Sequence, residues 1–184
     1  MKQTPPKEPK LLKADVYPAR TVLFLSLFLT VLGLVGCGHG EDSPSLQNVD
    51  GRYAAPAELA PYVDEFLAAA TAHSKAIDSA LVGKLSVIYD ESLPGAVIGR
   101  CEQYTGTGAK VIKIKKSRWE TIDEATRQSL TFHELGHCFL GRKHDDTTVD
   151  HGGSTAPASL MSTEIIHGNV FEAHREEYLA ELFK

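Results

Sequence analysis

The sequence predicts a small α+β domain that follows an N-terminal export signal. Three observations predict this fold: helical periodicity over residues 56–81, short strand-like segments between 85 and 115, and a helical segment from 121 that contains closely spaced histidines. About 148 residues follow position 36, enough for one domain with one core. No internal repeat and no Gly-rich phosphate loop is visible in the sequence.

The first 36 residues have the composition of a secretory signal. Basic residues precede an apolar run, residues 21–35, which is shorter than the roughly 20 residues of a membrane span. The run ends in Leu34-Val35-Gly36-Cys37, which resembles the lipobox of bacterial lipoproteins. The resemblance implies cleavage before Cys37, lipidation of that cysteine with chains such as palmitate, and anchorage to a membrane. An uncleaved anchor and a signal removed by the ordinary signal peptidase are the alternatives.

A lipoprotein of this kind belongs in the bacterial cell envelope, with its domain facing the periplasm or the exterior. Gly38 follows the cysteine where enteric bacteria use aspartate for inner-membrane retention, so by analogy an outer-membrane location is compatible with the sequence. Residues 37–50 are rich in Gly, Ser and Asp and are predicted to form a flexible tether. The folded domain is therefore expected over residues 51–184.

Net charge excludes one class of partner. Five of the 19 Lys and Arg residues and two of the 24 Asp and Glu residues lie within 1–36, so the remaining chain carries a formal charge of −8. An acidic domain gives no reason to expect nucleic acid as a partner.

The order of elements after the tether is helix, small mixed sheet, helix, loop and helix. Residues 56–81 place Leu59, Val63, Phe66, Leu67 and Ala70 at helical spacing and predict one long amphipathic helix. Strands are predicted over 85–89, 96–104 and 110–115, with Leu93-Pro94-Gly95 as a turn signal.

A second helix is predicted to start at a capping box formed by Thr121 and Glu124. A polar loop is predicted over 143–157, and a last helix over about 170–183.

The second helix contains His133, Glu134 and His137, and this spacing predicts a metal site. Two histidines four residues apart lie on one face of a helix, so both imidazoles can bind one ion. Glu134 points about 100° around the helix, which suits a base beside the metal. Gly141 has the position of a left-handed C-cap, from which the chain can return to bring His144 to the ion. Three protein ligands and one open position are typical of catalytic zinc.

This segment resembles the long zinc motif of the metzincin metallopeptidases, in which His-Glu-x-x-His is followed by a glycine and a third histidine. Ser159-Leu160-Met161 is similar to the Met-turn of that clan, a tight turn that lies under the metal at Met161. The resemblance implies a metzincin-like domain that holds one Zn²⁺ per chain and takes a protein or peptide as substrate.

Two features depart from the metzincin pattern. Three residues, instead of the usual two, separate His137 from Gly141, so His144 stands one position late and Asp145 is the substitute third ligand. Thr163 stands where several metzincins have a tyrosine that stabilises the oxyanion. Among the remaining histidines, His151 in the loop is a candidate supporting or substitute ligand, whereas His174 is predicted on a solvated surface.

Apart from Cys37, the chain contains two cysteines, Cys101 and Cys138. An even pair in an oxidising compartment predicts a disulfide, which would fix the zinc-binding helix to the segment around Cys101. Two free thiols, or Cys138 as a metal ligand, are the alternatives.

These observations predict a membrane-tethered zinc metallopeptidase that hydrolyses peptide bonds outside the cytoplasm, with zinc-bound water activated by Glu134. The alternative is a zinc-binding lipoprotein that has a structural or interaction role and no peptidase activity. The presence of Glu134 favours the first function, because a structural zinc site needs no base.

Overall fold

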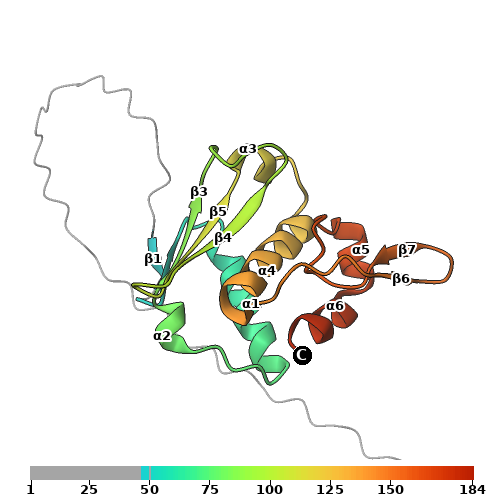
Figure 1. Cartoon of the computed structure of the whole chain (residues 1–184), viewed down its shortest axis with the longest axis horizontal. Coiled ribbons are helices and arrows are strands. Elements are labelled where there is room, and N and C mark those ends of the chain that lie inside the picture. Colours follow the sequence, from blue (N-terminus) through green and yellow to red (C-terminus); the bar gives the residue numbers. More distant parts are fainter. Residues whose placement is uncertain (1–46, 50) are drawn as a thin grey trace, which may run out of the picture. The chain divides into compact units, whose positions relative to one another are not determined.

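The computed structural model describes residues 47–49 and 51–184 (Figure 1). The signal predicted for residues 1–36, the lipidation predicted at Cys37 and most of the predicted tether lie outside the described residues. None of the helices in the described part is long and apolar enough to cross a membrane.

A five-stranded mixed sheet has the strand order β1-β2-β3-β5-β4. Strands β2, β3 and β5 run parallel to one another, whereas β1 is antiparallel to β2 and β4 is antiparallel to β5. Strand β4 is therefore an antiparallel strand at one edge of the sheet. The strands span Gln47–Val49 (β1), Tyr53–Ala55 (β2), Leu85–Tyr89 (β3), Gly99–Tyr104 (β4) and Ala109–Ile114 (β5).

Six helices and a small hairpin complete the described part of the chain. The α+β class and the small mixed sheet are thus confirmed. The helices span Ala60–Ala72 (α1), Ser79–Val82 (α2), Lys116–Trp119 (α3), Glu124–Leu140 (α4), Gly168–Ala173 (α5) and Arg175–Leu182 (α6), and the hairpin consists of β6, Thr148–Asp150, and β7, Thr155–Pro157.

Helices α1 and α4 pack against the same face of the sheet and enclose the core (Figure 1). Phe66 of α1 meets Phe132 of α4 edge to face, with the ring centroids 5.4 Å apart. Strand β5 alternates as a half-buried strand should, because Ile112 and Ile114 are buried while Lys113 forms ion pairs with acidic residues. The core thus gives α4 a rigid support, and α4 carries the predicted metal site.

The long helix predicted over 56–81 was wrong in its extent, because the chain forms two shorter helices there. Helix α1 ends at Ala72, and Ser74 adopts a left-handed conformation with φ 57°. The Lys75 N–H donates to the Ala70 carbonyl oxygen and the Ser74 N–H to the Thr71 carbonyl oxygen, which is the hydrogen-bond pattern of a Schellman motif. Glycine is the usual residue at such a helix end, and serine is rare there. The sequence therefore contains no glycine signal for the end of α1.

Other boundaries differ from the prediction for local reasons. Helix α4 is capped by Asp123, whose carboxylate accepts a hydrogen bond from the Thr126 N–H at 2.8 Å, and not by Thr121. The last helix is divided into α5 and α6 at His174, which has φ −125° and ψ 24°. The loop over 143–157 contains the β6–β7 hairpin, and β1 falls within the segment 37–50 that was predicted to be a tether.

Candidate metal centre

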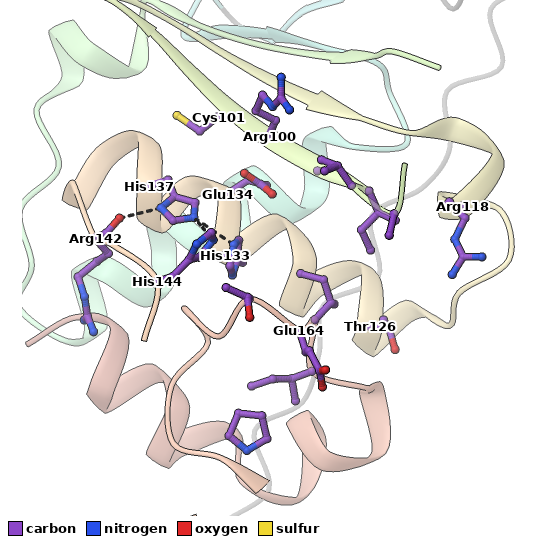
Figure 2. A pocket seen from close by; sticks show the side chains of 18 of the residues that line it. Arg100, Cys101, Arg118, Thr126, His133, Glu134, His137, Arg142, His144 and Glu164 are labelled. Carbon is purple, nitrogen blue, oxygen red and sulfur yellow. Dashed lines mark hydrogen bonds between the residues drawn. The ribbon is translucent and has the colours of Figure 1, made fainter. Parts of the chain in front are cut away.

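The structure brings together the three histidines that the sequence singled out (Figure 2). The Nε2 atom of His137 lies 3.1 Å from Nε2 of His133 and 3.2 Å from Nε2 of His144. Gly141 ends α4 with φ 63°, in the left-handed conformation predicted for it, and the chain then returns to place His144 beside the helix. Asp145 is not part of this cluster, since its carboxylate accepts hydrogen bonds from the Thr147 backbone and hydroxyl at 3.1 and 2.7 Å.

Hydrogen bonds at the far side of two rings determine which nitrogen faces the centre. Nδ1 of His133 lies 2.7 Å from the Leu160 carbonyl oxygen, and Nδ1 of His137 lies 2.7 Å from that of Arg142. A carbonyl only accepts, so both Nδ1 atoms carry the proton and both Nε2 atoms present lone pairs. Two lone pairs at 3.1 Å repel each other unless a cation lies between them. Around tetrahedral zinc, nitrogen atoms are about 3.3 Å apart, so the residues fit this ion.

Burial favours the neutral, metal-binding form of these rings. Desolvation lowers the pKa of His133 to about 4, although its hydrogen bond to the Leu160 carbonyl acts in the opposite direction. Desolvation also lowers the pKa of His137. Both imidazoles are therefore neutral at pH 7, which is the protonation state that metal binding requires.

Glu134 lies beside the histidines and is only 3% exposed. Burial raises the pKa of its carboxyl to about 8, while a hydrogen bond from the Cys101 backbone and the positive charge of Arg100 oppose the rise. A Cβ atom added at Gly99 would lie 2.4 Å from Oε1 of Glu134, so any larger residue there would displace the carboxylate from its place under β4. Gly99 was not among the residues predicted for the site, although an isolated glycine in a strand is a signal for close approach.

Strand β4 is fastened to helix α4 beside the histidines. Cys101 and Cys138 form a disulfide with a Cα–Cα distance of 5.7 Å, which confirms the predicted bond and leaves Cys138 no role as a metal ligand. The Gln103 side-chain amide donates to the His137 carbonyl oxygen at 2.9 Å. These links hold the edge strand over the helix, and therefore hold the Cys101 N–H against Glu134.

Met161 packs under the same helix. Its side chain is fully buried, and its Sδ atom would lie 2.7 Å from a Cβ added at Gly136, the residue that precedes His137. The Met161 N–H donates to the Ser159 hydroxyl at 3.0 Å, and the adjacent Leu160 carbonyl holds the His133 ring. The segment predicted to act as a Met-turn therefore both supports the helix and orients one histidine.

The C-terminal helix supports both sides of the centre. Glu181 of α6 accepts a hydrogen bond from the Ser159 hydroxyl at 2.7 Å and forms an ion pair with Arg142, whose carbonyl holds His137. The guanidinium of Arg142 also donates to the carbonyl oxygens of Glu181 and Leu182. This connection was not predicted, because no local sequence pattern links residues so far apart in the chain.

An open cleft of about 960 Å³ runs past the histidines. Glu134 and the histidines lie in one part of it, while Arg118, Thr126 and Glu164 lie further along (Figure 2). Thr163 also lines the cleft, and its hydroxyl donates to Asp146 at 2.9 Å. No tyrosine lines the cleft within the described part of the chain.

Comparison with protein-family models, with curated proteins and with solved structures finds no match to this chain. The chemistry of the site therefore carries the functional argument.

Proposed function

We propose that this protein is a zinc-dependent metallopeptidase of the metzincin type, tethered to a membrane of the cell envelope through lipid on Cys37. The observation that carries the proposal is the convergence of three Nε2 atoms beside a buried carboxylate in an open cleft. A closed structural zinc site has four protein ligands and no adjacent base, whereas this centre has three histidines and Glu134.

Each residue has a role in peptide hydrolysis. His133, His137 and His144 would hold the ion, which lowers the pKa of a water molecule and polarises the substrate carbonyl group. Glu134 accepts the proton of the attacking water on its carboxylate and passes it to the leaving amine. The Cys101 N–H, held in place by the disulfide, positions that carboxylate. Desolvation of Glu134 strengthens it as a base once it is ionised.

The edge strand beside the centre supports a peptide as substrate. Strand β4 pairs with β5 on one side, and no other described strand pairs with its second side. Its residues Gly99, Arg100 and Cys101 line the cleft. An extended peptide can add to such an edge through main-chain hydrogen bonds, which would place a scissile bond beside Glu134.

The absence of a tyrosine from the described cleft lining favours a second function, that of a zinc-binding lipoprotein with a structural or interaction role. A peptidase without this tyrosine needs another group as its oxyanion donor.

Zinc content and hydrolysis, measured together on the full-length protein, distinguish the two functions. We expect the protein to cleave a library of unstructured peptides, and Glu134→Gln to abolish cleavage while zinc remains bound at the histidines. Glu176→Gln, at an exposed glutamate of α6, is the matched control and should cleave at the wild-type rate. Bound zinc without cleavage of any library member would reject the peptidase and leave the structural function. Unchanged cleavage by Glu134→Gln would remove the proposed base.

A further inference from the structure

A second group of potential metal ligands lies outside the cleft. It consists of His151, at the turn of the β6–β7 hairpin, with His174 and Glu177 at the start of α6. One nitrogen or oxygen atom from each residue lies within 4.8 Å of the others. His151 therefore lies outside the first centre, for which it was a candidate supporting or substitute ligand, and His174, predicted on a solvated surface, is partly exposed beside it.

The distances within this group fit coordination better than hydrogen bonding. Oε2 of Glu177 lies 3.5 Å from Nδ1 of His174 and 3.8 Å from Nδ1 of His151. Hydrogen bonds between nitrogen and oxygen are typically 2.7–3.2 Å long, whereas ligand atoms around tetrahedral zinc are about 3.4 Å apart. Both Nδ1 atoms thus face the same carboxylate oxygen at close to the spacing of a coordination shell.

The backbone around the two imidazoles holds them side by side. Their rings stack with centroids 3.5 Å apart and an interplanar angle of 25°. His151 is held at the hairpin turn, where its backbone N–H donates to the Ser154 carbonyl oxygen at 2.9 Å. The Tyr178 hydroxyl donates to the Pro157 carbonyl oxygen at 2.8 Å and so joins α6 to the hairpin. The Glu177 side chain is 69% exposed and is free to move inward, and rotation of one ring out of the stack turns both Nδ1 atoms toward a shared ion.

We propose that His151, His174 and Glu177 form a second binding site for a divalent cation of the zinc type. Two imidazoles and one carboxylate are a donor set that suits zinc, and the exposed side of the site leaves the remaining position to water. Of the three residues, His151 lies on the segment that connects His144 to Met161, whereas His174 and Glu177 lie at the start of α6. A cation bound there clamps that segment to α6, independently of any hydrolytic activity.

Zinc stoichiometry of the metal-stripped and reconstituted full-length protein tests the site. The protein is titrated with Zn²⁺ alone, by calorimetry and by metal analysis after gel filtration. We expect two zinc ions per wild-type chain, one in His174→Asn, and an affinity of the second site at least tenfold lower in Glu177→Gln. The matched control Glu176→Gln should retain two ions at wild-type affinity.

The variants also separate the two centres. His137→Ala should lose the cleft ion and keep the hairpin ion, whereas His174→Asn should do the reverse and keep any peptidase activity. A wild-type protein that binds one ion, lost in His137→Ala and retained in His174→Asn, overturns the second site while leaving the proposed peptidase intact. Equal zinc content and affinity in wild type and Glu177→Gln overturns it as well. Because Glu177 is largely exposed, this variant decides the question even where His174→Asn does not fold.

Discussion

Burial of Glu134 predicts that the metal-free protein loses free energy of unfolding as the pH rises. Its pKa is raised to about 8 in the folded state, against 4.5 for an exposed carboxyl. Because the folded-state pKa lies above the unfolded value, the contribution of Glu134 to the free energy of unfolding is fully present below pH 4.5 and is lost as the pH rises toward 8. The full difference corresponds to about 5 kcal/mol, since one pH unit is worth about 1.4 kcal/mol. Glu134→Gln keeps the shape of the side chain and removes the titration.

We therefore expect the free energy of unfolding of the metal-free Gln variant, minus that of wild type, to rise by several kcal/mol between pH 4.5 and 8. Urea unfolding followed by circular dichroism, with chelator present and the disulfide oxidised, measures this difference. Glu176→Gln controls for the loss of one negative charge. With zinc bound, the adjacent cation favours the carboxylate, so the difference should shrink. A difference that stays constant within about 1 kcal/mol over this range would refute the reasoning.

Three further predictions concern the framework of the centre. Gly99→Ala places a methyl group against the Glu134 carboxylate, so kcat/KM for peptide cleavage should fall at least tenfold at unchanged zinc content. Replacing Cys101 and Cys138 by serine opens a link between residues 37 positions apart, which should lower the free energy of unfolding by about 4 kcal/mol in urea titrations. In Gly141→Ala the added methyl group meets no atom within 4 Å, but alanine strains the left-handed backbone. Thermal unfolding should therefore show a free energy of unfolding lower by about 1 kcal/mol, and calorimetry should show a weaker zinc affinity.

The two glycine substitutions have matched controls. Gly106→Ala adds a methyl group at a β4–β5 turn position with nothing within 4 Å, and it should leave cleavage unchanged. Gly141→Asn should be tolerated better than Gly141→Ala, because asparagine adopts the left-handed conformation more readily. Equal effects of the two Gly141 substitutions would contradict the backbone argument, and a wild-type rate in Gly99→Ala would show that the carboxylate has room to move.

The sequence predicted those parts of the centre that depend on helical spacing. His133 and His137 follow from an interval of four residues, and the return of the chain to His144 follows from a glycine at the helix end. The disulfide could be predicted because only two cysteines remain after Cys37.

The missed parts depend on contacts between distant segments. Gly99 matters because β4 crosses the helix at Glu134, and His151 meets His174 where the hairpin lies beside α6, to which Tyr178 joins it. Neither contact produces periodicity or a motif along the chain. The helix ends were misplaced for a different reason. Ser74 ends α1 without the usual glycine signal, and Asp123 caps α4 although Thr121 and Glu124 have the form of a capping box.

The extra residue between His137 and Gly141 has a structural explanation in the last turn of α4. The Gly141 N–H donates to the carbonyl oxygen of Gly136, five residues back, where an α-helix would use four. The Arg142 N–H donates to the same oxygen at 3.2 Å. The widened turn takes up one residue, so the left-handed glycine still directs the chain back toward His137. The interval from Gly141 to His144 is the same as in the motif that the sequence resembles, and over this interval the chain brings Nε2 of His144 to 3.2 Å from Nε2 of His137.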